Sequence, residues 1–150
     1  MVTWQLTIDA HDPARLVEFW APVLGYEVQP PPDGFTTWNE WYLSKGVPAD
    51  ELDPDRDAVD RIWDPTGAGP RIWFQIVPEQ KSVKNRFHLD VYPTNRDRDL
   101  PWDERTTLVD RRVTELVEAG ASIRNRTIDR ENGFYAVGMF DPEGNEFCVA

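Results

Sequence analysis

The residues best suited to chemistry lie at matched places in a repeated strand pattern. Gln5 stands in residues 4–9 (WQLTID) and His88 in residues 87–92 (FHLDVY), and both segments read aromatic, polar, Leu, polar, aliphatic. An imidazole can ligate a metal or hold a pocket ligand by a hydrogen bond, so His88 is a candidate for either role. The neutral amide of Gln5 is a weak metal donor, which favours a pocket role.

The short apolar strands that close each repeat carry further candidates. Gln75 lies in the first of them, residues 73–76, and Cys148 in the second, residues 146–149. Gln75, like other neutral amides, is favoured as a pocket residue over a metal ligand. Cys148 is either a small buried hydrophobic residue or a reactive or metal-bound thiol.

Two carboxylates share strand faces with these candidates. Glu146 lies two residues before Cys148 and therefore on the same face of its strand, displaced by roughly 6 to 7 Å. It is a candidate catalytic base or metal ligand, or else the salt-bridge partner of Arg86 or Arg71. Asp90 lies two residues after the repeat histidine and can orient that imidazole.

The elements that position these residues form two βαβββ units. Alternation over residues 3–9 predicts a strand, and Asp12-Pro13 predicts a helix start with an acidic cap and a proline in the first turn. Gly25 is a plausible C-terminal cap. Repeats of this length indicate two similar halves whose matched polar residues meet in one groove. The expected later elements are strands 26–28, 36–43 and 71–77, then strand 86–92, helix 104–119 and strands 122–127, 134–140 and 145–149.

An acidic segment rich in Asp, Pro and Gly spans residues 47–70. We interpret it as a solvated loop with one short helical turn, or a functional lid, in which Ile62 and Trp63 can fold back as an anchor. Tryptophan is abundant, at 7 residues, and Trp38 and Trp73 lie on predicted strands that could wall a pocket.

The bulk composition excludes several classes of partner. The formal net charge of -11 opposes binding to nucleic acid and to anionic membranes, and no run of residues reaches the length of a membrane helix. A single cysteine rules out an intramolecular disulfide and a thiolate-rich zinc site. We expect a cytoplasmic protein.

Three motifs make the chain similar to the vicinal oxygen chelate superfamily. They are the helix with Phe19-Trp20 that ends Leu24-Gly25-Tyr26, the segment 84–91 (KNRFHLDV) and the closing segment 141–147 (DPEGNEF). The resemblance spans residues 3–149 outside the acidic loop. It implies an α+β fold with a cupped mixed sheet, the glyoxalase/bleomycin resistance fold, in a single domain over residues 1–150 with modules at about 3–78 and 85–149.

The resemblance also implies the positions of a metal quartet, which here are Gln5, Gln75, His88 and Cys148. Neither closing strand offers a carboxylate there, whereas the superfamily's isomerase chemistry needs one beside a divalent metal. Two amides, one imidazole and one thiol are a poor set for Mg²⁺ or Mn²⁺. We therefore expect no cofactor, or a weakly held divalent metal such as Zn, Mn, Ni or Fe.

The resulting expectation is a small-molecule-binding protein with a degenerate or absent metal site, acting as a homodimer. The alternative is a metal-dependent lyase, isomerase or dioxygenase that uses His88 with Gln5 and either Glu146 or Cys148. A third possibility is a protein-interaction or regulatory domain without a ligand. The sequence leaves open whether the chain is an enzyme. The expected ligand-binding residues are Gln5, Trp38, Trp73, Gln75, His88, Asp90, Glu146 and Cys148.

Overall fold

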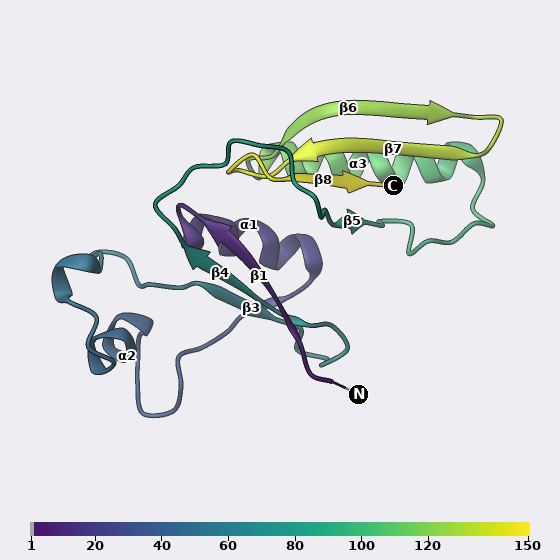
Figure 1. Ribbon diagram of the computed structural model, residues 1–150. Helices are drawn as coiled ribbons and strands as arrows, with labels where there is room; N and C mark the ends of the chain where they lie inside the picture. The colour runs from purple at the N-terminus through teal and green to yellow at the C-terminus, as the bar shows by residue number, and fades with distance from the viewer. Residues whose placement is uncertain (1) are drawn as a thin grey trace. The chain divides into compact units, whose positions relative to one another are not determined.

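The computed structural model describes residues 2–150 and divides into two compact units, Met1–Glu79 and Gln80–Ala150. Each unit contains one four-stranded mixed sheet, and the two sheets have the same internal order: first strand, last strand, third strand, second strand (Figure 1). The α+β fold that the resemblance implies is thereby confirmed. Among residues 2–150, none of the helices combines the length and apolarity needed to cross a bilayer.

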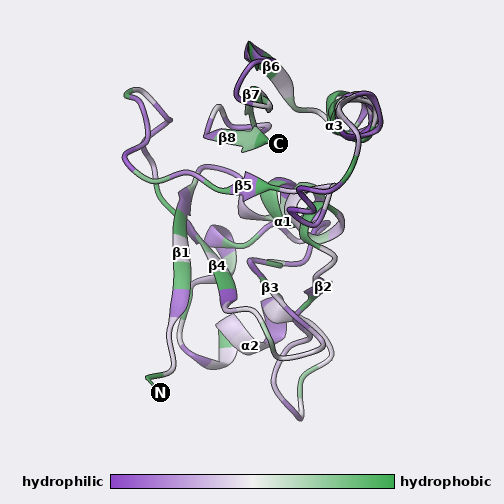
Figure 2. Cartoon of the chain, turned by 90° about the vertical axis from the view of Figure 1, so that its right-hand side faces the viewer, coloured by the Kyte–Doolittle hydropathy of each residue, from purple (hydrophilic) through white to green (hydrophobic). Residues whose placement is uncertain are grey.

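In unit 1 the first and last strands pair in parallel, and the remaining neighbours pair antiparallel. Hydropathy alternates along the first strand, so one face of the sheet is apolar and the other polar (Figure 2). The apolar face packs on α1 and buries Ile62, Ile72 and Phe74. The elements are β1 (Gln5–Ala10), α1 (Pro13–Leu24), β2 (Glu27–Val28), α2 (Trp38–Ser44), the 3-10 turn η1 (Ala49–Glu51), β3 (Arg61–Trp63) and β4 (Arg71–Ile76).

The first helix begins and ends where the sequence predicts. The Asp12 carboxylate accepts a hydrogen bond from the Arg15 backbone N–H at 3.1 Å, and Pro13 fills the first turn. Gly25 ends the helix with φ of 68°, a left-handed conformation that glycine adopts without steric cost. Pro22 does not end the helix, which runs on to Leu24.

The predicted strand 36–43 is wrong, because this segment forms the helix α2. Thr37 and Glu40 form a capping box, in which the threonine hydroxyl accepts from the Glu40 N–H at 3.1 Å and the Glu40 carboxylate accepts from the Thr37 N–H at 3.2 Å. The third strand of the unit is instead β3, inside the segment read as loop 47–70. Of the two predicted anchor residues, Ile62 is confirmed, since it lies in β3 and is fully buried. Trp63 is wrong as an anchor, because its side chain is 40% exposed.

Unit 2 repeats the arrangement, with β5 parallel to β8 and antiparallel pairing elsewhere. Its helix α3 packs on the sheet through Val109, Val113 and Leu116. The predicted strand 86–92 shortens to two residues, and Phe87 before it is 90% exposed. The elements are β5 (Asp90–Val91), α3 (Trp102–Glu118), β6 (Ser122–Asp129), β7 (Phe134–Phe140) and β8 (Glu146–Val149).

Candidate functional site

Three potential metal-binding side chains meet where β5 pairs with β8. Asp90 lies directly opposite Cys148, and the Cys148 N–H donates to the Leu89 carbonyl at 2.9 Å. His88 precedes Asp90 by two residues, which returns its side chain to the same face of the extended chain. One ligand atom from each of His88, Asp90 and Cys148 lies within 4.8 Å of the other two.

The electrostatics of this cluster follow from its carboxylate. The His88 Nε2 lies 3.3 Å from the Asp90 Oδ1, so the carboxylate can orient the imidazole as the sequence predicts. Burial raises the pKa of the Cys148 thiol, and the nearby Asp90 charge raises it further. At neutral pH the side chain is therefore a thiol, which must lose its proton before it can ligate a metal.

The donor set of this cluster suits zinc better than a hard cation. Zn²⁺ accepts imidazole, thiolate and carboxylate together, whereas Mg²⁺ and Mn²⁺ prefer sites built from oxygen donors. Around a tetrahedral zinc, ligand atoms are roughly 3.3 to 3.8 Å apart. The distance of 3.3 Å between the His88 Nε2 and the Asp90 Oδ1 falls in this range, and one ligand atom from each of the three side chains lies within 4.8 Å of the other two.

Glu146 lies on β8 in a closed set of polar contacts. Its Oε2 accepts from the Asn85 backbone N–H at 3.0 Å and pairs with the Lys81 Nζ at 3.2 Å. The hydrogen bond from Asn85, assisted by Lys81, lowers the pKa of Glu146 to about 2. A carboxylate held so strongly ionised is a weak proton acceptor, which weighs against a general-base role. The sequence predicts a salt bridge as one role of Glu146, and the structure contains one. Its partner is Lys81 and not Arg86 or Arg71.

In unit 1 the amide of Gln5 is occupied by a cation from the protein itself. Gln5 pairs with Arg71 across β1 and β4, and the Arg71 Nε donates to the Gln5 Oε1 at 2.9 Å. The amide oxygen is the only atom of this side chain that can ligate a metal ion. A guanidinium bound to it both uses its lone pairs and repels a second cation.

The strand register also separates the two glutamines that the resemblance places in one quartet. Gln75 pairs with Asp9, four residues along β1 from Gln5. Four residues of strand span about 13 Å, so the two amides cannot ligate a common ion in this register. In unit 2, Cys148 pairs with the second residue after His88. The second residue after Gln5 in unit 1 is Thr7, which pairs with Trp73. By strand register, therefore, the residue of unit 1 that matches Cys148 is Trp73.

Trp73 belongs to a hydrogen-bonded network centred on a buried carboxylate. Asp60, only 7% exposed, accepts from the Trp73 indole Nε1 at 2.9 Å and the Arg61 Nε at 2.5 Å, and the Tyr42 hydroxyl also donates to it. The Arg61 guanidinium lies 4.1 Å from the centre of the Trp38 ring. Trp38 itself is 2% exposed and donates its indole N–H to the Gln29 carbonyl, so this predicted ligand residue lies in the core of unit 1.

Sequence reasoning missed the basic residues that neutralise the candidate site. The sequence pattern suggests Arg71 only as a partner of Glu146, and it gives no indication of the Lys81 contact. The alternation of β4 places Arg71 on the same face as Trp73. The contact between Arg71 and Gln5, at the start of β1, is therefore predictable if β1 and β4 are assumed to pair in parallel. The Lys81 contact is not predictable, because it joins a loop to a strand 65 residues away.

Comparison with known families gives one match that covers nearly the whole chain. A family model described as "Glyoxalase-like domain" matches residues 5–150. No curated protein matches the chain.

Solved structures share the fold at low sequence identity. The hypothetical protein SA1046 from S. aureus is 13% identical with a TM-score of 0.56, covering 99% of this chain and 92% of that chain. A glyoxalase/bleomycin resistance protein/dioxygenase family enzyme from Burkholderia phytofirmans PsJN is 15% identical with a TM-score of 0.54, covering 97% and 94%. A variant of the fosfomycin resistance protein FosX from Listeria monocytogenes, complexed with Mn(II) and 1S,2S-dihydroxypropylphosphonic acid, is 10% identical with a TM-score of 0.56, covering 99% and 90%.

Proposed function

Since this chain belongs to the glyoxalase-like domain family, we propose that it binds a small organic molecule and that its family metal site is degenerate. The observation that carries the proposal is the contact between Arg71 and Gln5, in which a guanidinium takes the amide oxygen expected to ligate a metal. The FosX relative was crystallised with Mn(II), an ion that prefers oxygen donors. Unit 1 of this chain offers no free oxygen donor at that strand position.

The residues of the closing strands support the same proposal. A metal-assisted isomerase needs a carboxylate base next to its metal. Here the closing-strand positions hold Cys148 in unit 2, and Gln75 or Trp73 in unit 1, depending on whether sequence alignment or strand register defines the match. The neighbouring carboxylate, Glu146, is neutralised by Lys81. We propose that the organic ligand contacts a polar strand face. The candidate contacts are Gln5, Trp73 and Gln75 in unit 1 and His88, Asp90 and Cys148 in unit 2.

Native mass spectrometry of protein purified without chelator tests the proposal. We expect a species heavier than the apo chain by the mass of an organic molecule, and we expect that extra mass to disappear under denaturing conditions. The extra mass should decrease in His88→Ala and persist in the control Arg111→Gln, whose side chain is exposed on α3. A spectrum in which manganese or iron is the sole bound species would contradict the proposal.

A second candidate function is a zinc-dependent enzyme, which the cluster of His88, Asp90 and Cys148 favours. Equilibrium dialysis against Zn²⁺ and Mn²⁺ separates it from the first. The enzyme hypothesis requires one tightly bound Zn²⁺ per chain, lost in both His88→Ala and Cys148→Ala. Zinc that binds equally well to both variants would contradict it.

The family resemblance also implies a homodimer, and the single cysteine suits a reducing compartment such as the cytoplasm. Light scattering coupled to size exclusion tests the first point. The expected mass is twice the 17.4 kDa of the chain, and a mass equal to that of one chain would exclude the dimer.

A further inference from the structure

A cavity of about 520 Å³ lies in unit 2, between the segment that leads from β5 to α3 and the turn that joins β6 to β7. Its volume is within the range of small-molecule sites. His88, Cys148 and Glu146 are not among its lining residues. Three arginines contribute to its wall, together with the aromatic residues Tyr92, Phe134 and Tyr135.

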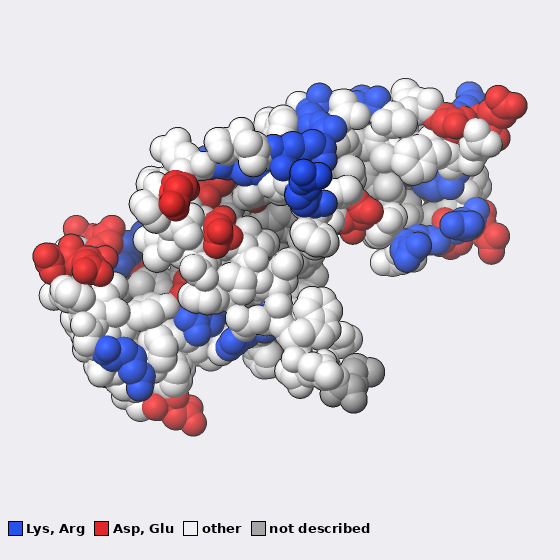
Figure 3. Space-filling model, viewed as in Figure 1, with Lys and Arg blue, Asp and Glu red and all other residues white. Residues whose placement is uncertain are grey.

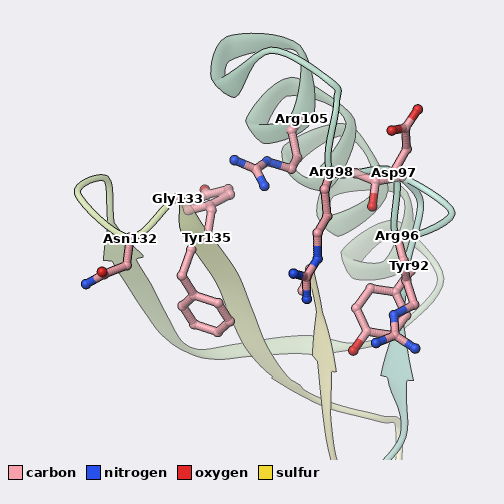
Figure 4. Close-up of a pocket in the computed structure, with 11 residues that line it drawn as sticks. Tyr92, Arg96, Asp97, Arg98, Arg105, Asn132, Gly133 and Tyr135 are labelled. Carbon is pink, nitrogen blue, oxygen red and sulfur yellow. The ribbon is translucent and has the colours of Figure 1, made fainter.

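The arginines are Arg96, Arg98 and Arg105. In the close-up, the Arg98 side chain runs down the middle of the view, with Tyr92 and Arg96 on one side and Tyr135 on the other (Figure 4). Among residues 2–150, none of these three guanidiniums forms an ion pair with a carboxylate of the chain. Three guanidiniums of unit 2 therefore line one cavity without an ion-pair partner among the described residues.

The gathering of three arginines at one cavity is informative because the chain as a whole is acidic. Asp and Glu exceed Lys and Arg by 27 to 16, so an arginine placed at random meets more acidic than basic neighbours. The side chains of the cavity reverse this ratio, with three arginines and one acidic residue, Asp97. That carboxylate is engaged locally, because its Oδ1 accepts from the Asp99 backbone N–H at 2.9 Å. Basic side chains are visible along the segment between β5 and α3 in the space-filling view (Figure 3).

The backbone of this segment holds Arg96 in place at a conformational cost. Asn95 and Arg96 have φ of 52° and 61°, and within residues 2–150 they are the only non-glycine residues with positive φ. Tight hydrogen bonds fix the turn, from the Asn95 N–H to the Tyr92 carbonyl and from the Asp97 N–H to the Thr94 carbonyl, both at 3.0 Å. Outliers of this kind are retained at sites where the geometry has a use.

Arg105 is the third guanidinium in the wall of the cavity. Its Nε is buried without a hydrogen-bond partner among the described residues. Its guanidinium lies 5.5 Å from the centre of the Trp102 ring. Because the Nε is itself buried, an anion in the cavity would pair with the terminal nitrogens of this guanidinium.

We propose that this cavity is a binding site for a small organic anion that joins a carboxylate or a phosphate group to a planar ring. The guanidinium fork matches the two oxygens of either group, and Arg98 and Arg96 are placed to pair with it. The ring would lie against Tyr92 and Phe134, which are 36% and 50% exposed. The proposal is independent of the function proposed above, because none of the lining residues is a candidate contact of that site.

Isothermal titration calorimetry with phenyl phosphate and with benzoate tests this site, using benzyl alcohol as the neutral probe. We expect one site per chain for at least one of the anions and no heat from benzyl alcohol. Affinity should fall as salt rises, because the contacts are charged. If only phenyl phosphate binds, the site prefers phosphate, and if only benzoate binds, it prefers carboxylate.

Three variants locate the binding. Arg98→Gln should lower the affinity for the anionic probe by about tenfold. Arg111→Gln, an equal charge change on the exposed side of α3, should leave that affinity within about twofold of the wild-type value. Arg96→Gly should weaken binding without lowering the melting temperature, because glycine suits the positive φ. A purely structural role of Arg96 predicts unchanged binding.

The proposal is overturned if neither anion binds at probe concentrations up to about 10 mM, because the affinity of the site would then be negligible. It is equally overturned if Arg98→Gln and Arg111→Gln lower the affinity for the probe to the same extent. Binding would then depend on the net charge of the protein and not on the residues of this cavity.

Discussion

Asp90 and Cys148 lie opposite each other on the paired parallel strands β5 and β8. The carboxylate and the burial of the thiol act in the same direction, since both raise the pKa of Cys148. Cys148 is the only cysteine of the chain, so its reactivity can be measured without interference.

The first prediction concerns the reactivity of this thiol. Alkylation by iodoacetamide at pH 7.5 should be slower than for a free thiol such as glutathione, because less thiolate is present. Asp90→Asn should accelerate the reaction, since it removes the negative charge that disfavours the thiolate. The rates can be followed by mass spectrometry. Equal rates for the wild type and Asp90→Asn would show that the carboxylate does not act on the thiol.

The second prediction concerns the charge of Glu146. Its pKa in the folded state, about 2, lies below the ordinary value of 4.5. A lowered carboxyl pKa stabilises the fold above about pH 4.5, and this stabilisation is lost as the pH falls toward about 2. Glu146→Gln should therefore cost about 1 to 2 kcal/mol of unfolding free energy at pH 7, and progressively less as the pH falls below about 4.5.

Urea unfolding at several pH values measures this difference, with Glu131→Gln in the exposed β6–β7 turn as the matched control. A deficit for Glu146→Gln that stays constant from pH 7 to pH 3 would contradict the lowered pKa that the Asn85 hydrogen bond and Lys81 give this carboxyl group.

The third prediction concerns the buried carboxylate of unit 1. Asp60 satisfies Arg61, Tyr42 and Trp73 together, and burial followed by the Asp60 contact raises the pKa of Tyr42 to about 12. Asp60→Ala leaves a part-buried guanidinium without its partner and should cost about 3 to 5 kcal/mol of unfolding free energy. Asp50→Ala, in the exposed turn η1, should cost less than about 0.5 kcal/mol. Similar losses of unfolding free energy in Asp60→Ala and Asp50→Ala would contradict the stabilising role given to the Asp60 network.

The fourth prediction concerns the acidic segment 47–70, whose carboxylates are visible beside η1 in the space-filling view (Figure 3). Asp57 accepts from the backbone N–H groups of Trp38 and Asn39 at 3.0 and 2.7 Å, which ties the segment to the start of α2. Asp57→Ala should cost about 1 kcal/mol and expose the segment to proteolysis. Asp55→Ala serves as control, and equal cleavage of both variants would argue that the segment is not anchored there.

The helices show what the sequence could predict in the fold. The first was predictable because its caps, Asp12 and Gly25, are local features of the chain. The second was misread as a strand because its aromatic and polar residues were weighed and the Thr37–Glu40 capping box was not. The box was present in the sequence and is the stronger signal, because it satisfies backbone groups that only a helix start leaves unpaired.

The site was predictable only where the pairing of strands agrees with the pattern of residues. His88, Asp90 and Cys148 meet because β5 and β8 pair in the register that the repeat suggests. Gln5 and Gln75 do not meet, because the register of β1 and β4 is two residues away from the alignment of the two halves. A shift of two residues keeps every side chain on its face, so alternation of hydrophobic residues cannot reveal it.

Metal analysis of protein purified without chelator tests the central claim most directly. The contact between Arg71 and Gln5 and the absence of a carboxylate at position 148 predict substoichiometric manganese, nickel and iron. One tightly held ion of any of these metals per chain, released by His88→Ala but not by Arg111→Gln, would contradict the claim that the family metal site is degenerate.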